Sequence, residues 1–414
     1  MLGKHSLTLP LVAALVTLTV RLLTYRVKEY IPLPYHFGIT TPNTGAESWK
    51  ETVFWKQQFG VVPDYLTVVV PWYVEYIPRL PSVVNVNILC VCDALTVFIV
   101  SQWPSAIPQL LFTLFVLNPA MVLLPALESL APIEHLVLTL IIECSRRRRS
   151  RGWLIYVARI LASVLGFHFI ALTVALWFPV GTSSSRWALF GVLLGELIVG
   201  GFGLLYLVFW GGLRARTSLY SPPDNGVMWY VRLLIIPVFE RCMEVFQIQL
   251  PAFVTLLVAV ALPPEVPAMT LRCASSVPGD RRLLLVLFAV CASKLCRCHL
   301  ALPDYSVAVV FIYSLLDTMG GKGKVGKAET EQSMFDRIKN ANVFVPVYTL
   351  LLVVPLQYGF YTGWVMWDTA NPNWVFFPQV AFVIVGAIFM LTFLGKAFAA
   401  IKAEATVGDK PKRL

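Results

Sequence analysis

The sequence predicts an all-α, polytopic membrane protein, and three observations lead to that prediction. Of the 414 residues, 57% are hydrophobic and only 14% are charged, and the mean hydropathy is +0.72. Soluble domains are about 45–50% apolar and about 25% charged, so this chain has too few charges to cover a soluble surface. Disorder is excluded because it requires low hydrophobicity and high charge. The apolar residues also gather into long runs, as they do in membrane-spanning helices.

The first apolar run, residues 7–24, predicts an N-terminal membrane helix. It is similar to a secretory signal, but the residues around Arg21 offer no small-residue cleavage site, so we expect an uncleaved anchor. Residues 26–82 form a long polar segment rich in Pro, Trp and Tyr. This aromatic content predicts an ordered loop with short helices that lie at the membrane interface.

Counted with the first helix, the apolar runs predict about twelve membrane segments in one domain that spans residues 1–414. Several runs are shorter than the ~20 residues that a perpendicular span needs, so re-entrant or broken helices are expected. The runs after the loop are 84–102, 106–126, 131–143, 153–178, 188–211, 228–247, 250–262, 283–297, 300–317, 342–366 and 375–400.

The basic residues predict the orientation of these segments. If the N-terminus is cytosolic and the segments alternate, every basic cluster falls in the cytosol, as the positive-inside rule requires. The loop 26–82 then faces the lumen and the tail 401–414 the cytosol. The loops account for the net charge of +10, so no nucleic-acid partner is expected. The clusters are Arg146–Arg149 with Arg151, Arg214 with Arg216, Arg281 with Arg282, Lys322 with Lys324 and Lys327, and Lys410 with Lys412 and Arg413.

Lys410 and Lys412 stand fifth and third from the end of the sequence. This spacing is similar to the dibasic signal that retrieves membrane proteins to the endoplasmic reticulum. We therefore expect a multi-pass protein of that membrane with both termini in the cytosol. A basic flank of the last membrane segment is an equally good interpretation.

Ionisable side chains inside the apolar runs are candidate functional residues, because a charge in the bilayer is costly. We interpret Glu240, Arg241 and Glu244 as an internally neutralised helix face, with a lipid-headgroup site and a proton pathway as alternatives. The full set is Arg21, Asp93, Arg159, Glu196, Arg232, Glu240, Arg241 and Glu244.

Neither a cofactor nor a metal site is expected. Cysteines and a histidine crowd together from Cys291 to His299, and zinc accepts such atoms. However, a Cys-x-Cys step on a helix directs its thiols to different faces, and Lys294 and Arg297 add unfavourable charge. Burial or palmitoylation is the preferred interpretation of these cysteines.

The chain is not expected to be an enzyme. It contains no Gly-rich phosphate loop, no His-Glu-x-x-His helix and no Gly-x-Ser-x-Gly elbow. A membrane glycosyltransferase with a lipid-phosphate sugar donor needs a carboxylate or a carboxylate pair in its first lumenal loop. The carboxylates of this loop, among them Glu29, Glu51 and Asp64, are scattered and never adjacent or one apart. A single well-placed carboxylate remains the alternative.

Six short patches occur along nearly the whole chain, and together they resemble one family. They are Gly-Val-Val-Pro-Asp-Tyr at 60–65, Cys-Asp-Ala-Leu at 92–95, Leu-Asn-Pro at 117–119, Pro-Asp-Asn-Gly-Val-Met-Trp-Tyr at 223–230, Val-Phe-Gln-Ile at 245–248 and Ala-Asn-Pro-Asn-Trp at 370–374. The family is PIG-U, the polytopic subunit of the transamidase that attaches glycosylphosphatidylinositol (GPI) to proteins in the endoplasmic reticulum. The chain departs from it at 384–387, where Ile-Val-Gly-Ala replaces Asn-x-Gly-Gln. At 302–306, Leu-Pro-Asp-Tyr-Ser only weakly resembles the family's Tyr-Pro-x-x-Gly-Asp.

The resemblance implies a fold similar to that of the polytopic mannosyltransferases that use lipid-linked sugars, and a non-catalytic role. The chemistry would belong to a caspase-like cysteine protease, one of the other transamidase subunits that would be partners. This chain would bind the GPI lipid or the C-terminal attachment signal, among membrane lipids. The residues implied for binding are Asp93, Asn118, Gly226, Trp229, Tyr230, Gln247, Asn373 and Trp374.

We expect Asn118, Trp229, Gln247 and Trp374 to border a lumen-facing cavity, where amides and indoles hydrogen-bond a headgroup. For each of them, ordinary helix packing is the alternative. Two other functions remain open: a membrane mannosyltransferase with a dolichyl-phosphate donor, and a transporter or scramblase. The latter predicts inverted repeats with matched broken helices.

Overall fold

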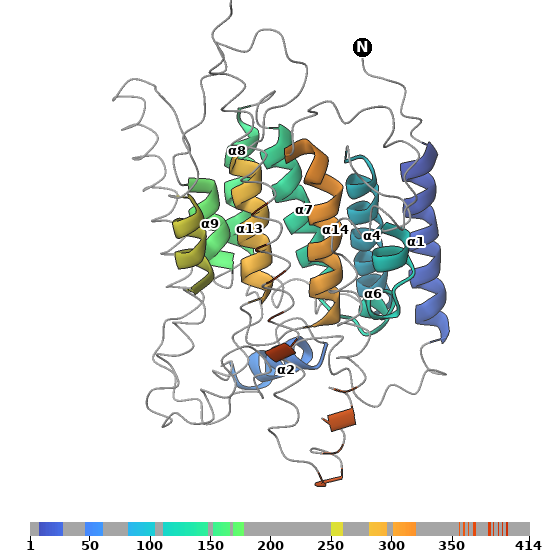
Figure 1. Ribbon diagram of the computed structural model, residues 1–414. Coiled ribbons are helices and arrows are strands. Elements are labelled where there is room, and N and C mark those ends of the chain that lie inside the picture. Colours follow the sequence, from blue (N-terminus) through green and yellow to red (C-terminus); the bar gives the residue numbers. More distant parts are fainter. Residues whose placement is uncertain are drawn as a thin grey trace, which may run out of the picture.

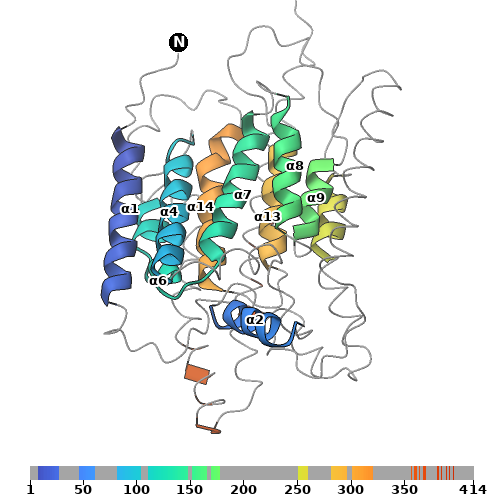
Figure 2. The same cartoon turned by 180° about the vertical axis from the view of Figure 1, so that it is seen from behind.

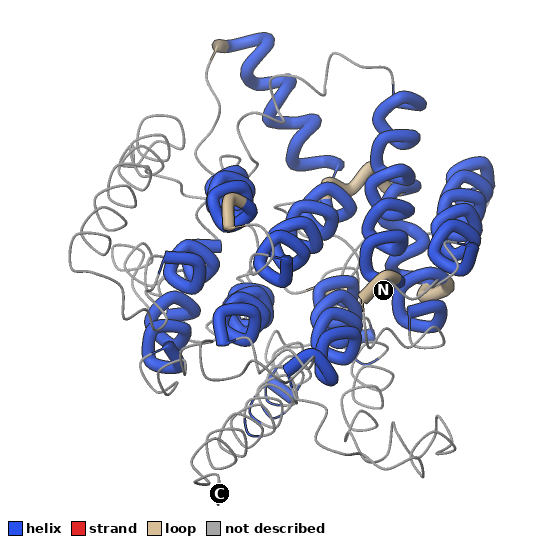
Figure 3. The backbone as a smooth tube through the Cα atoms, turned by 90° about the horizontal axis from the view of Figure 1, so that it is seen from above, coloured by secondary structure: helices blue, strands red, loops and turns tan. Residues whose placement is uncertain are grey.

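The computed structural model describes residues 8–27, 46–60, 82–103, 111–147, 152–165, 169–177, 250–259, 281–295 and 301–319, with isolated positions between 356 and 395. All regular structure in these residues is helical and none of it is strand, so the all-α class is confirmed for this part of the chain. Figure 1 shows long helices side by side, and Figure 3 views most of them end-on. They are α1 (Thr8–Val27), α2 (Ala46–Phe59), α4 (Ser82–Ser101), the π-helix η4 (Phe112–Val116), α6 (Pro119–Ala126), α7 (Ala131–Arg147), α8 (Leu154–Val164), α9 (Ile170–Trp177), the helix Leu250–Ala259, α13 (Arg281–Leu295) and α14 (Leu302–Met319).

Two of the described helices, α1 and the stretch Val84–Ser101 of α4, are long and apolar enough to cross a membrane. A third span is counted if α6 and α7, which meet at 114°, form one broken span. Both single spans coincide with predicted apolar runs, and the bent pair is of the kind expected from short runs. The total of about twelve segments stays a prediction, because several runs lie outside the described residues.

α1 lies at the edge of the bundle (Figure 2) and packs against α4. Its buried residues, Ala13, Thr17 and Arg21, recur every four positions and therefore share one face. Leucines on the other face, such as Leu15 and Leu23, are more than half exposed. A membrane span tolerates such a face, because acyl chains are as apolar as leucine.

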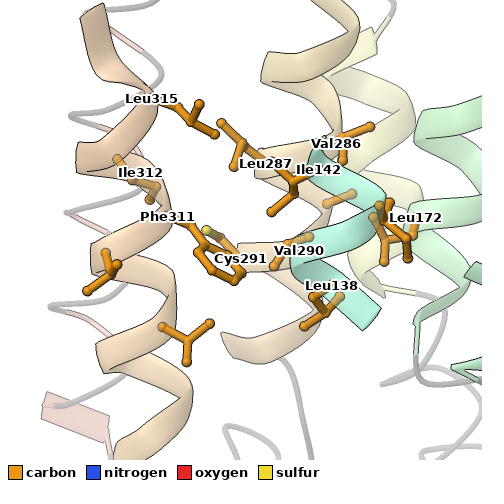
Figure 4. Packing of buried hydrophobic residues seen from close by; sticks show 14 of the residues in the cluster. Leu138, Ile142, Leu172, Val286, Leu287, Val290, Cys291, Phe311, Ile312 and Leu315 are labelled. Atoms are coloured by element: carbon orange, nitrogen blue, oxygen red, sulfur yellow. The ribbon is translucent and has the colours of Figure 1, made fainter. Parts of the chain in front are cut away.

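α13 forms the centre of the described bundle. Every side chain from Leu283 to Ala292 is buried, and a helix that is apolar all round belongs in the interior. Around it pack Leu138 and Ile142 of α7, Leu172 of α9, and Phe311, Ile312 and Leu315 of α14 (Figure 4).

Two predicted apolar runs are each divided into shorter helices. Run 106–126 contains η4 and α6, which are separated at Asn118. Asn118 precedes Pro119, the first residue of α6, and has the extended ψ of 120° that a residue before proline favours. Run 153–178 contains α8 and α9, and the sequence has the poor helix former Gly166 between them.

The ends of the helices are sorted by charge. Lys294 at the C-terminal end of α13 bonds to Glu134 and Asp304, which lie in the first turns of α7 and α14. The other ends of α7 and α13, which carry Arg146–Arg147 and Arg281–Arg282, therefore lie together at the opposite face of the bundle. Two predicted basic clusters thus share one side, and the compartment that this side faces stays a prediction.

α2 is a short helix in the first loop, as the sequence predicted. Lys50 Nζ lies 2.9 Å from Glu128 Oε2, in the turn before α7, so α2 is attached at the end opposite the arginines. Phe54 and Phe59 are more than half exposed, and the ring of Trp55 lies 4.7 Å from that of Phe59. α2 lies across one end of the bundle (Figure 1). Exposed aromatic rings on a helix in such a position are typical of the membrane interface.

Candidate functional site

Arg21 is the centre of a fully buried polar group. Its Nε donates to Asp93 Oδ2 over 2.9 Å, and neither side chain has any exposed surface. Its Nη1 and Nη2 donate to the carbonyls of Val116 and Phe115, each over 2.8 Å. These carbonyls lie at the end of η4, where a helix leaves acceptors without intrahelical partners. Arg21 therefore joins α1, α4 and η4 in one contact.

Asp93 uses only one carboxylate oxygen in this ion pair. Its other oxygen, Oδ1, is buried and has no hydrogen-bond partner in the part of the chain that the structure describes. Arg21 thus supplies the positive charge that compensates this carboxylate inside the bundle. A charge in the membrane interior needs such a partner.

Asn118 holds the break between η4 and α6. Its Oδ1 accepts from the backbone N–H of Ala120 over 3.0 Å, which makes it the N-cap of α6. Its Nδ2 donates to the carbonyl of Leu114 (3.2 Å) and to Ser306 Oγ of α14 (2.8 Å). The side-chain amide therefore connects three elements, and it is half-buried.

These contacts bring together three of the segments that carry the resemblance described in the sequence analysis. Asp93 belongs to the patch 92–95, Asn118 to 117–119, and Ser306 to the weaker match 302–306. Arg21 binds Asp93 and the backbone just before Asn118, and Asn118 binds Ser306. One polar network therefore runs from α1 to α14 through all three.

A second buried polar group, which we name the Lys294 cluster, consists of Lys294, Glu134, His135 and Asp304. Lys294 Nζ bonds to Glu134 Oε1 and Asp304 Oδ1 and lies 5.9 Å from the ring of Phe169. His135 is fully buried. Ligand-type atoms of Glu134, His135 and Asp304 all lie within 4.8 Å of one another.

This cluster is not among the sites predicted from the sequence. Glu134 and Asp304 stand just inside the ends of apolar runs, and in the sequence Lys294 stands out only as an unfavourable charge beside the cysteines. The predicted topology contained the information that could have identified it. It placed the starts of runs 131–143 and 300–317 and the end of run 283–297 on the same side of the membrane. Three ionisable residues at neighbouring run ends on the same side indicate a shared site.

The arginine end of the bundle has its own polar contacts. Glu143 accepts from Arg146 Nε over 2.8 Å, from Arg147, and from Trp103 Nε1 over 3.0 Å. This carboxylate links the end of α7 to the residues that follow α4. On α8, Arg159 Nη2 donates to the carbonyl of Leu176 over 3.1 Å.

Of the residues predicted for binding, the structure describes Asp93 and Asn118, which the network above connects through Arg21. The other predicted binding residues, the two lysines of the predicted retrieval signal and five of the ionisable residues in the predicted apolar runs lie outside the described residues. They are Gly226, Trp229, Tyr230, Gln247, Asn373, Trp374, Lys410, Lys412, Glu196, Arg232, Glu240, Arg241 and Glu244.

Among the first-loop carboxylates that a glycosyltransferase would use, the structure describes Glu51. It lies on α2 with an exposed side chain, and its Oε1 accepts from Trp55 Nε1 over 3.4 Å. Glu29 and Asp64 lie outside the described residues. In comparisons with known proteins, no protein-family model and no curated protein matches this chain.

Proposed function

We propose that this chain is a non-catalytic membrane subunit of the GPI transamidase of the endoplasmic reticulum. In this role it helps bind the GPI lipid, the C-terminal attachment signal of the precursor protein, or both. The transamidation itself belongs to a caspase-like cysteine protease on another chain. Both termini lie in the cytosol, and the loop that contains α2 faces the lumen.

The observation that carries the proposal is the network from Arg21 to Ser306. Sequence patches that resemble one family along a chain support a common fold more strongly when they also meet in space. Here three such segments meet. Arg21 joins Asp93 to two backbone carbonyls just before Asn118, and the Asn118 side chain donates to Ser306.

The charges of the described bundle also favour a binding role over catalysis. Asp93 is held by Arg21, and Glu134 and Asp304 are held by Lys294. A general base must reach the proton that it removes, and carboxylates in buried ion pairs are poorly placed for that. Helices with exposed apolar faces, such as α1, offer contact surface to lipid or to the helices of other subunits.

Purification of the tagged chain in mild detergent tests the proposed partnership. We expect a caspase-like cysteine protease to co-purify in a fixed ratio, as identified by mass spectrometry. A matched purification of an unrelated multi-pass protein of the same membrane controls for detergent carry-over. Absence of the protease from the purified complex would refute the proposal.

Depletion of the chain separates the three candidate functions. Loss of a transamidase subunit leaves complete GPI lipid and uncleaved precursor proteins to accumulate together. Loss of a mannosyltransferase instead yields a glycolipid that lacks a mannose, and this result would replace our proposal with the first alternative. Complete lipid with normally processed precursors would contradict our proposal and favour a transporter.

A further inference from the structure

The Lys294 cluster has the chemistry of a cation site. Oxygens of Glu134 on α7 and Asp304 on α14 converge on the Nζ atom of Lys294 from α13. The side chains of Lys294 and Asp304 are 3% and 5% exposed, and that of Glu134 is 14% exposed. Two carboxylates on different helices are therefore positioned to share one positive charge away from bulk water.

An imidazole completes the set. Ligand atoms of Glu134, His135 and Asp304 lie within 4.8 Å of one another. Around one metal ion with bonds of about 2.1 Å, such atoms stand roughly 3–4 Å apart. The longest of these separations therefore has to shorten by roughly 1–2 Å for all three side chains to bind the same ion. We propose that Glu134, His135 and Asp304 form a site for a divalent transition-metal cation, and that Lys294 is the internal cation that the metal displaces.

The ligand set indicates the class of metal. Calcium and magnesium prefer all-oxygen sites, whereas an imidazole with two carboxylates suits Zn²⁺, Mn²⁺ or Co²⁺. Lys294 and the metal compete for the same oxygens, because an ammonium and a divalent ion repel each other at that distance. When Lys294 pairs with these carboxylates the metal is excluded, and when the metal is bound Lys294 cannot pair with them.

The position of the cluster indicates from where the ion enters. It lies at the same end of α7 as the turn that contains Glu128, to which Lys50 of α2 is bonded, and at the opposite end from Arg146. Glu134 is the most exposed of the ligands. Metal supply therefore comes from the compartment that α2 faces. This inference does not depend on the proposed function.

Cobalt titration of the full chain tests the site. The chain is purified in mild detergent with the subunits that accompany it, stripped with a chelator, and titrated with Co²⁺ while visible absorption and melting temperature are followed. Lys294→Met should bind Co²⁺ at least about tenfold more tightly than wild type, because changes beside a metal site alter affinity by about 10–100-fold. Cobalt should also raise the melting temperature of this variant more than that of wild type.

Variants on α7 provide the specificity control. Glu134→Gln, in the Lys294→Met background, should lower cobalt affinity at least about tenfold, since it removes a ligand. Glu143→Gln is the matched change at the other end of the same helix and should leave cobalt binding unchanged. The two variants share helix and chemistry, so a difference between them assigns binding to the cluster.

Three results would overturn the inference. The first is equal cobalt affinity of wild type and Lys294→Met, or no binding by either. The second is a thiolate-to-cobalt charge-transfer band that disappears in Cys296→Ser/Cys298→Ser, because it places the ion on the cysteines. The third result concerns the case in which Lys294→Met does not fold even with cobalt. Wild type is then compared with Asp304→Asn, and equal cobalt affinity of these two chains would exclude the site.

Discussion

Arg21 and Asp93 form a buried ion pair between α1 and α4, with 2.9 Å between Nε and Oδ2 and no exposed surface on either side chain. The guanidinium also satisfies the last carbonyls of η4. The contact therefore links the predicted anchor helix to the broken segment around Asn118. It makes α1 an integral part of the described bundle.

Arg21→Met should destabilise the protein strongly, because it leaves Asp93 buried without a counter-charge. Breaking a buried pair from one side costs about 3–5 kcal/mol, whereas replacing both charges with apolar residues is often near neutral. In thermal unfolding of the purified chain, the melting temperature should fall strongly in Arg21→Met. It should recover substantially in Arg21→Met/Asp93→Leu. Arg26→Met, at an exposed position of the same helix, is the control. A double variant as unstable as the single one would contradict the prediction.

Changes at Asn118 should separate its capping role from its contact with Ser306. Asn118→Ala removes both, together with the bond to the Leu114 carbonyl, and should cost about 2–3 kcal/mol, the sum of a helix cap and two further hydrogen bonds. Asn118→Ser keeps a capping oxygen but is too short to reach α14. It loses both bonds of Nδ2 and should cost about 1–2 kcal/mol, whereas Ser306→Ala loses one of them and should cost about 1 kcal/mol.

The same variants distinguish a tether from a lipid ligand. If Asn118 acts only by connecting helices, GPI attachment to a reporter should fall in proportion to the amount of intact complex. If it also binds lipid, as the resemblance implies, attachment should fall at unchanged complex level in Asn118→Ser but not in Ser306→Ala. Thr113→Ala, at an exposed position of η4, is the control for both readouts.

Much of the described fold could be predicted from the sequence. Apolar runs located α1, α4, α7, α13 and α14, and the aromatic loop predicted a short helix, which is α2; its place at a membrane interface stays a prediction. Breaks within runs were expected in general, but their positions were not, because they depend on local features such as the proline after Asn118.

The site residues were predicted less completely. Arg21 and Asp93 were found because each is a charge inside an apolar run, but their pairing was not, since a sequence does not give the register between helices. Asn118 was singled out by resemblance as a binding residue, and its role as a cap emerges only from the geometry. Lys294 was missed because a charge near the end of an apolar run looks like an ordinary flank.

The turn between α6 and α7 leads to a prediction about backbone strain. Ser129 N–H donates to the Leu124 carbonyl over 3.0 Å and Glu128 N–H to that of Pro125 over 2.9 Å, which is the Schellman arrangement. Glu128 occupies the position with positive φ, at 54°, where glycine is normally favoured.

Glu128→Gly should therefore be more stable than Glu128→Ala by about 1 kcal/mol, because a side chain in the left-handed region costs about 1–2 kcal/mol. Both variants lose the ion pair with Lys50, so the difference between their stabilities reports only the cost of the backbone conformation at position 128. Lys50→Ala, which loses only a half-exposed pair, should cost less than about 1 kcal/mol. Thermal unfolding of the three variants side by side checks the order. Equal stability of the glycine and alanine variants would contradict it.

The opposite placement of α2 and the arginine end of α7 gives a test of topology. Gln57 on α2 and Arg147 on α7 are both exposed, and their helices meet the bundle at opposite ends. In intact microsomes, a membrane-impermeant maleimide should label Arg147→Cys, because positive-inside orientation places it in the cytosol. Gln57→Cys should react only after permeabilisation. The wild-type chain, with Cys90, Cys92 and Cys291 buried, sets the background.

An introduced glycosylation site checks the lumenal position of α2 by an independent readout. Asn43 stands two residues before Gly45 in the sequence that leads into α2. Gly45→Thr therefore completes an Asn-x-Thr acceptor at Asn43, which should gain an N-linked glycan because only lumenal acceptors meet the transferase. Gly45→Val keeps a β-branched side chain without the hydroxyl and should stay unmodified. Labelling of both cysteines from the same side, together with an unglycosylated Gly45→Thr chain, would refute the topology and the lumenal position of α2 with it.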